Sequence, residues 1–238
     1  MRFDWAFAFD VLPVLAKAAI ITVQATLVGY AVALSFGLAL ALMRRSRAKW
    51  LSWSAAGFIE FVRSTPLLVQ LYFMYFVLPD FGITMSALTT GILGLGLHYA
   101  TYTAEVYRAG IESIPKGQWE AARAFGLSRF RTYQKVIVPQ AIPPVVPALG
   151  NYFVSMFKET PLLSAIAVVE LMQRAKIIGS ETFRYLEPIT LVGLFFLGLS
   201  LAAAWAVRRA ESHFSLTRRM KQAAEDADEN AVAPSSPA

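Results

Sequence analysis

The chain has 238 residues, of which 56% are hydrophobic and only 16% are charged, with a net charge of +6 and no cysteine. The lack of cysteine excludes a disulfide framework and a thiolate metal or redox site. The charged fraction is well below the roughly 25% of soluble domains, and the lysines and arginines stand at the ends of apolar runs, so the composition indicates a membrane protein and no nucleic-acid partner.

Residues 1–17 lack the basic region of a signal peptide, and we expect them to form an extracytoplasmic N-terminal segment. The segments that follow approach the length of about 20 apolar residues that crosses a bilayer. The sequence therefore predicts an all-α integral membrane protein whose transmembrane domain covers residues 18–210. Its five predicted transmembrane helices cover residues 18–43, 58–78, 85–107, 144–168 and 189–207.

Three of these predicted helices carry unusual residues. The second contains Glu60, Arg63 and Pro66, so its first turns should be sheltered by protein. The third is rich in Gly, Ala and Thr, which predicts an interior position because small residues let membrane helices approach closely. The fourth contains Lys158 and Glu159, polar groups that lipid would not accept unpaired.

The distribution of basic residues predicts the orientation of the chain. Segments 44–49, 108–135 and 208–221 contain fifteen lysines and arginines, against five in the other three connecting or terminal segments. By the positive-inside rule the N-terminus lies outside and the C-terminus lies in the cytoplasm. We expect residues 211–238 to be a cytoplasmic tail that is disordered from about residue 223, because that stretch has few bulky apolar groups.

The connection over residues 115–139 is long and patterned, and it predicts two short cytoplasmic helices. Gly126 is suited to end the first helix with a positive φ, Ser128 can cap the second, and Pro139 should stop it. Periodicity alone leaves open an amphipathic elbow that lies on anionic lipid.

The residues of this loop resemble the EAA loop of bacterial ABC importer permeases. Glu120-Ala121-Ala122 is followed after three residues by Gly126 and after nine more by Val136-Ile137-Val138-Pro139, where valines replace the usual Ile and Leu. The resemblance implies a type I ABC importer permease fold, in which this loop docks on the ATPase subunit. The residues that it assigns to ATPase coupling are Glu120, Ala121, Ala122, Gly126 and Pro139.

Two further stretches are similar to the polar amino-acid branch of this family (His/Glu/Gln/Arg/opine). They are EFVRSTPLLVQLYFMYFVLP from residue 60 and FKETPLLSAIAVVELMQRA from residue 157. KIIGSETFRYLEPITLVGL and GLGLHYATYTAEVYRAGIE look most like the ectoine/hydroxyectoine permeases of the Ehu type. The resemblance thus implies uptake of polar amino acids or similar compatible solutes, with ectoine as the best candidate and osmoprotection as its purpose.

Buried polar residues near the second and fourth predicted helices are candidates for the path of the solute. Lys158 and Glu159 could instead form an internal ion pair, and Arg63 could extend to the interface or pair with Glu60. His98 has no second histidine nearby, so no metal site is expected. The candidate path residues are Arg63, Thr65, Gln70, Lys158, Glu159 and Thr160.

The chain has no phosphate-binding G-x-x-x-x-G-K-[ST] stretch, so it is not expected to be an enzyme or to hold a cofactor. The resemblance implies three partners at the inner membrane of a bacterium: an ATPase dimer that binds ATP and Mg²⁺, a second identical or homologous permease, and an extracytoplasmic solute-binding protein. The alternative is a self-contained channel or an ion-driven secondary transporter, which should show inverted repeats. No repeat is evident, and that alternative leaves the EAA loop unexplained.

Overall fold

The computed structural model describes residues 3–232, with side chains as far as Ser212, and this part of the chain is all-helical. The α-helices are α1 Trp5–Arg44, α2 Lys49–Arg63, α3 Leu67–Tyr72, α4 Ala87–Glu112, α5 Lys116–Ala124, α6 Arg129–Thr132, α7 Val138–Glu159, α8 Leu171–Thr182 and α9 Leu186–Val232. Four short segments are the π-helical η1 Phe73–Val77 and η3 Tyr133–Ile137 and the 3-10 helices η2 Leu78–Phe81 and η4 Thr160–Ile166.

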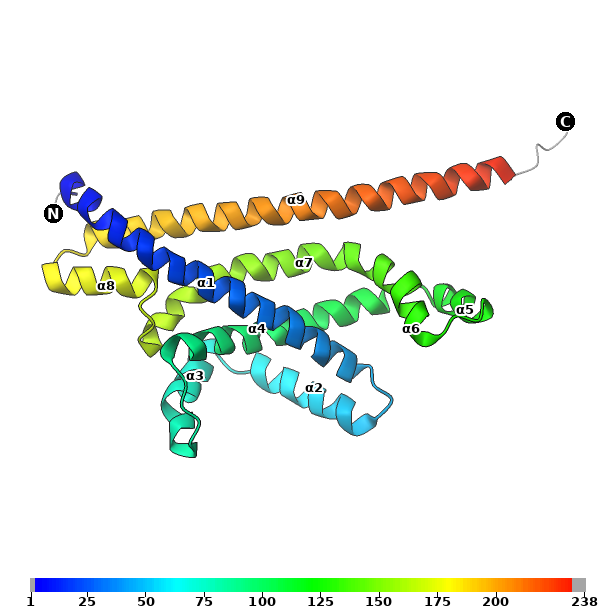
Figure 1. Cartoon of the computed structure of the whole chain (residues 1–238), viewed down its shortest axis with the longest axis horizontal. Helices are drawn as coiled ribbons and strands as arrows, with labels where there is room; N and C mark the ends of the chain where they lie inside the picture. The colour runs from blue at the N-terminus through cyan, green and yellow to red at the C-terminus, as the bar shows by residue number, and fades with distance from the viewer. Residues whose placement is uncertain (1–2, 233–238) are drawn as a thin grey trace.

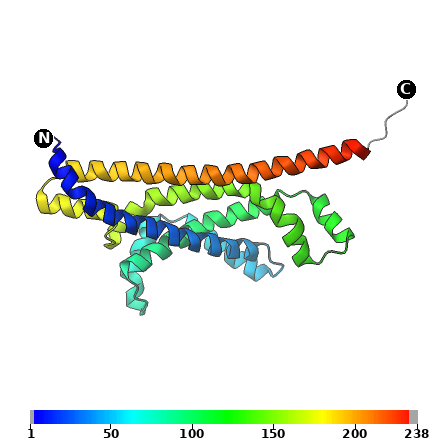
Figure 2. The same cartoon turned by 45° about the horizontal axis from the view of Figure 1, so that its top comes forward.

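The long helices lie roughly along one axis and form an elongated bundle (Figure 1). The start of α1 lies with α8 at one end, whereas the small helices α5 and α6 lie toward the other end (Figures 1 and 2). The α3 segment projects from the side of the bundle in both views. The predicted cytoplasmic loop is therefore at the opposite end from the predicted outer face.

Helix α1 begins earlier than the first predicted transmembrane helix, so most of segment 1–17 belongs to the same helix. Asp4 caps it by accepting hydrogen bonds from the backbone N–H groups of Ala6 and Phe7. Arg184, in the connection between α8 and α9, forms an ion pair with Asp4 at 3.1 Å. The Phe7 N–H and the Arg184 guanidinium together hold the pKa of the Asp4 carboxyl below its usual value.

Helix α4 lies inside the bundle, which confirms the prediction made from its small residues. Thirteen of its 26 residues are buried, and it packs against α1, α2, α3 and α7. On α1, a Cβ added to Gly37 would lie 2.8 Å from the backbone oxygen of Ala100. Glycine at this position is what allows α1 and α4 to pack backbone to backbone.

The second predicted transmembrane helix is wrong as a single helix. The chain breaks between Arg63 and Leu67, and α2 meets the following segment at 104°. Pro66 supplies no N–H to a continuing helix, and its ring disfavours the helical conformation at Thr65. The turn is satisfied locally, because the Thr65 hydroxyl donates to the backbone oxygens of Phe61 and Val62 at 3.1 and 3.2 Å.

Two helices in the described residues are long and apolar enough to cross a membrane: α1 and the Leu186–Ser212 part of α9. The bent pair of α2 with Leu67–Phe81 could supply a third crossing. The prediction of five crossings remains open at α4 and α7, whose polar, glycine and proline residues lower their hydropathy. The fourth predicted helix is also divided, since α7 ends at Glu159 and η4 continues it.

The expectation that Pro139 stops a helix is wrong. The chain passes through Pro139 from η3 into α7, and Pro143, Pro144 and Pro147 also lie inside α7. The π-helical turn at Tyr133–Ile137 ends two residues before Pro139, and η1 ends two residues before Pro79 in the same way. A π turn changes the hydrogen-bond register, so the missing proline N–H no longer ends the helix.

The tail also differs from its prediction. Helix α9 continues to Val232, whereas disorder was expected from about residue 223. Residues 213–232 are rich in Ala, Glu, Lys, Arg and Gln and contain no glycine or proline, which favours a continuing helix. The end of the predicted disordered stretch, residues 233–238, lies outside the described residues.

Candidate transport site and coupling loop

The two helix breaks share a short sequence pattern. Residues 63–68 read RSTPLL and residues 158–163 read KETPLL, so a basic residue, any residue, Thr, Pro and two leucines recur 95 positions apart. The expectation of no repeat therefore misses this six-residue similarity, although it is far too short to be an inverted repeat of helices. Leu67 and Leu163 lie in one buried cluster, so the two breaks pack near each other in the bundle.

At each break, the threonine hydroxyl donates a hydrogen bond to the backbone of the preceding turn. Thr160 is fully buried and donates to the Phe157 oxygen at 2.7 Å, and Thr65 donates to its own preceding turn. Both hydroxyl hydrogens are used in shaping the breaks. Thr65 and Thr160, both predicted to line the solute path, thus shape the two helix breaks in this structure.

Gln70 connects the first break to α4. Its amide nitrogen donates to the Val62 oxygen and to the Thr65 hydroxyl, both at 2.7 Å. Its side-chain oxygen lies 3.1 Å from Nδ1 of His98. His98, which was considered only as a metal ligand, is thus part of the polar cluster around the break, and the described residues contain no group of three or more potential metal ligands around it.

Aromatic rings form a wall beside these polar groups. Tyr102 lies between His98 and Tyr152, with ring centroids at 5.3 and 5.4 Å, and Tyr99 lies 6.1 Å from both tyrosines. The Arg63 guanidinium lies 5.1 Å from the centre of the Tyr102 ring. It makes no ion pair with Glu60 in the described part of the chain, and Glu60 instead accepts a weak bond from Ser64. The rings thus supply several π faces, which attract cations.

Glu159 is the polar residue of this cluster whose hydrogen bonds are incomplete. Its Oε2 atom is buried and has no hydrogen-bond partner among the described residues, while Tyr99 interacts with the carboxylate. Lys158 is exposed, and no ion pair joins it to Glu159 in the described residues, so the internal ion pair left open by the sequence does not form there. A buried carboxylate oxygen without a donor is costly unless a ligand or water supplies one.

The tyrosines were not predicted, because Tyr99 and Tyr102 read as ordinary apolar positions of a helix. The recurring TPLL pattern could have identified the pair of breaks, and the aromatic residues three apart on α4 could then have been placed between them. This cluster of side chains thus contains a carboxylate oxygen, π faces and a guanidinium. This arrangement suits a zwitterion or a cation.

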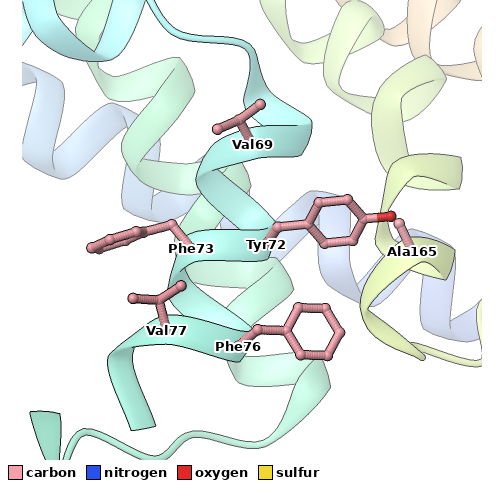
Figure 3. Close-up of a pocket in the computed structure, with 6 residues that line it drawn as sticks. All are labelled: Val69, Tyr72, Phe73, Phe76, Val77 and Ala165. Atoms are coloured by element: carbon pink, nitrogen blue, oxygen red, sulfur yellow. The ribbon is translucent and has the colours of Figure 1, made fainter. Parts of the chain in front are cut away.

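An apolar surface groove lies elsewhere. A shallow groove of about 560 Å³ runs along the outside of α3, where Tyr72 and Phe76 point toward Ala165 of η4 while Phe73 and Val77 point away (Figure 3). Its lining is almost entirely apolar. It therefore lacks the polar groups that would orient a polar solute, and we do not place the solute there.

The loop over residues 115–139 has the predicted turn between two helices, although the second, α6, continues through η3 into α7. Gly126 ends the first helix with φ 70°, and Ser128 caps the second by accepting from the backbone N–H of Arg131 at 3.4 Å. Glu120 and Ala121 are exposed, while Ala122 is buried against the loop. The face around the turn thus stays free for a partner protein.

Two phenylalanines beside the turn were not predicted to be exposed. Phe125 is 84% exposed and Phe130 is 74% exposed, whereas Ile137, farther along the same segment, is fully buried. Exposed phenylalanines beside a turn are typical of surfaces that contact a protein or a membrane. The loop itself is held by Trp119, whose ring meets Tyr133 edge to face at 5.3 Å.

Comparison with known proteins identifies the family. Residues 33–215 match the family model described as "Binding-protein-dependent transport system inner membrane component". The chain is 48% identical over 205 residues, 86% of this chain and 89% of the relative, to the probable amino-acid ABC transporter permease protein y4tG of Sinorhizobium fredii (strain NBRC 101917 / NGR234). It is 35% identical over 224 residues, 93% and 99% of the two chains, to the glutamine transport system permease protein GlnP of Escherichia coli (strain K12).

Solved structures show the same fold. A chain in the crystal structure of an amino acid ABC transporter with histidines superposes with a TM-score of 0.83 at 35% identity, covering 90% of this chain and all of that one. A chain of the inward-facing MetNI methionine ABC transporter superposes with a TM-score of 0.66 at 19% identity over 89% of this chain and 99% of that one, which supports the fold alone.

Proposed function

Because the chain belongs to the family of binding-protein-dependent transport system inner membrane components, we propose that it is the permease through which a bacterial ABC importer takes up polar amino acids by alternating access. The chain is a non-catalytic, multi-pass subunit of the bacterial inner membrane, and ATP hydrolysis belongs to a separate subunit. The relatives that carry amino-acid and glutamine names support the solute class.

The observation that carries the solute proposal is the unsatisfied Oε2 atom of Glu159 beside the tyrosines. The ammonium group of an amino acid supplies the missing donor and lies against the π faces of Tyr99 and Tyr102. Arg63, stacked on the Tyr102 ring, is proposed to receive the carboxylate. Gln70, Thr65 and Thr160 hold the shape of the two breaks.

The narrower solute, ectoine or hydroxyectoine, is kept only as one compound to be assayed. It carries a carboxylate and a delocalised cation, so the same groups suit it. The relatives reported above are named for amino acids or glutamine, however, and they give it no support. We therefore propose the polar amino-acid class and rank ectoine and its osmoprotective role below it.

The coupling proposal assigns the loop to an ATPase dimer that binds ATP and Mg²⁺. Glu120 and Ala121 are exposed beside the turn at Gly126, and Phe125 extends from it, which supports docking into a cleft of the partner. Pro139 does not end the loop, and its proposed role becomes rigid continuation into α7. A self-contained channel or an ion-driven transporter gives this exposed loop no role.

The remaining partners follow from the proposed mechanism. A single chain with two to three strongly apolar membrane crossings is too small to enclose a solute path, so we propose that it pairs with a second copy or a homologous permease. We also propose that a solute-binding protein delivers the solute from outside. Trp5 near one end of α1 and Trp50, Trp53 and Trp205 on α2 and α9 are all exposed, as expected for tryptophan, which favours both membrane interfaces. Lipid covers the remaining apolar surface.

The solute proposal is tested by uptake into proteoliposomes that contain the permease with the ATPase and binding protein encoded beside it. We expect Glu159→Gln to raise the KM for labelled glutamine, histidine or arginine by about tenfold or more, because a charge-assisted hydrogen bond is lost. Glu181→Gln, at an exposed position on α8, is the matched control and should behave as wild type. Unchanged KM values in Glu159→Gln for every solute tried, ectoine included, would rule the site out.

The coupling proposal has its own test in the same liposomes. Glu120→Lys reverses the charge of the docking face, and Gly126→Pro cannot adopt the positive φ that ends α5. Both should abolish ATP-dependent uptake. If uptake survives in both variants, the loop does not couple to the ATPase.

A further inference from the structure

Arg45, the residue that follows α1, lies where three elements meet. Its Nη1 atom lies 3.7 Å from Oε1 of Glu112 at the end of α4. Its guanidinium also lies 5.9 Å from the centre of the Trp119 ring in α5. One side chain thus touches the last turn of α4 and the coupling loop while belonging to the end of α1.

The contacts continue in both directions from Arg45. Glu112 is also paired with Arg108, which binds Glu105 one turn earlier on α4 at 2.7 and 2.9 Å. On the other side, Trp119 packs on Tyr133 of η3, which leads directly into α7. A continuous series of side-chain contacts therefore joins the loop to α1, α4 and the start of α7.

Arg45 makes the weakest polar contacts of this series. Its Nε atom is buried and has no hydrogen-bond partner among the described residues. Its distance to Glu112 is also longer than the distances that join Arg108 to Glu105. A buried donor without an acceptor is costly, so an arrangement that supplied an acceptor would recover part of that cost.

We propose that Arg45 is a positioning residue that transmits movement of the coupling loop to α1 and α4. The inference rests on the proposed function, because the loop must be moved by an ATPase. When the ATPase pulls α5, Trp119 carries the stacked guanidinium with it, and the Arg45–Glu112 contact draws α4 in the same direction. Without Arg45 the loop stays joined to α4 and α7 by the chain and by the buried Ile111–Ile137 cluster, but it loses its side-chain link to the end of α1, and more ATP is hydrolysed per solute transported.

The simpler role for Arg45 is a positive charge at the C-terminus of α1, where cations favour the helix dipole. Lysine would serve that role equally well, but it lacks the planar group that stacks on Trp119 and donates sideways to Glu112. Arg44, its neighbour, is also basic and close to the end of α1, and no contact with Glu112 or Trp119 involves it. Arg45→Lys and Arg44→Gln are therefore the informative companions of Arg45→Gln.

The experiment measures the number of ATP molecules hydrolysed per solute imported by the complete reconstituted complex. We expect Arg45→Gln to raise this ratio about fivefold or more, the fold-change of a typical coupling energy, while basal ATPase activity and subunit assembly stay as in wild type. Arg45→Lys should also raise it, and Arg44→Gln should not. If Arg45→Lys keeps the wild-type ratio, Arg45 acts only as a positive charge at the end of α1. If Arg45→Gln loses ATPase activity and uptake in parallel, its role is structural. Either result overturns the proposal.

Failure of the proposed function looks different. If the wild-type complex shows no ATP-dependent uptake, or if Glu120→Lys leaves uptake unchanged, the coupling loop itself is misassigned. If Glu120→Lys abolishes uptake and Arg45→Gln retains the wild-type ratio, only the Arg45 inference fails.

A distance measurement gives a readout that a purely structural role would not change. The chain has no cysteine, so spin labels can be placed at Ala109→Cys on α4 and Ala124→Cys on α5, both exposed positions. On ATP binding the distribution of distances between the labels should stay narrow in the parent and broaden with Arg45→Gln. A distribution that stays equally narrow in both contradicts a mechanical link through Arg45.

Discussion

At the scale of single residues, the contact between α1 and α4 depends on one missing methyl group. A Cβ at Gly37 would meet the backbone oxygen of Ala100 at 2.8 Å, and backbone cannot rotate away as a long side chain can. We expect Gly37→Ala to lower the free energy of unfolding by about 1 to 3 kcal/mol, the usual cost of overpacking. Thermal unfolding in detergent, followed by circular dichroism, measures the change.

Gly57→Ala on α2 is the control for this prediction. A Cβ there meets nothing within 4 Å, so alanine should be neutral or stabilise the helix by up to about 1 kcal/mol. Equal melting temperatures for Gly37→Ala and wild type would show that the two helices separate at little cost.

At the scale of elements, the coupling loop depends on the turn between α5 and α6. Gly126 has φ 70°, a conformation that costs an L-residue about 1 to 2 kcal/mol, whereas Gly117 lies inside α5 with open space around it. We expect Gly126→Ala to speed amide hydrogen exchange across α5 and α6 and to reduce uptake. Gly117→Ala should slow exchange in α5, because alanine favours the helix.

Exchange that changes equally in the two alanine variants would mean that the turn conformation does not hold the loop together. Both variants leave the exposed surface of the loop nearly unchanged, so a difference between them reports the backbone and not the docking contacts.

The same elements show what the sequence could and could not predict. The turn at Gly126 and the cap at Ser128 were predictable, because each depends on residues within four positions. The passage through Pro139 was not, because a π turn has no clear sequence signal and rests on packing of the buried Ile137. In the candidate site, Glu159 was conspicuous as a charge in an apolar segment, whereas Tyr99 became meaningful only once α4 and α7 were placed together.

At the scale of the whole molecule, the orientation is open to direct measurement. Gln118 lies on α5 and Ser180 on α8, near opposite ends of the bundle, and both are exposed. In intact cells a membrane-impermeant maleimide should label Ser180→Cys and leave Gln118→Cys unlabelled, since fifteen of the basic residues mark the side of Gln118 as cytoplasmic.

Permeabilised cells supply the control, because both cysteines should then react. Labelling of Gln118→Cys alone in intact cells would reverse the orientation, and labelling of both would mean that the two positions share one side of the membrane.

Helix α9 is longer than a membrane crossing requires. It runs unbroken from Leu186 to Val232, and 47 residues at 1.5 Å each make a rod of about 70 Å, whereas the hydrocarbon layer is about 30 Å thick. About 40 Å of this rod therefore extends beyond the membrane. A tilt of about 10° at the membrane surface would displace the far end by about 7 Å, so a small rearrangement among buried helices would give a larger movement beyond the membrane.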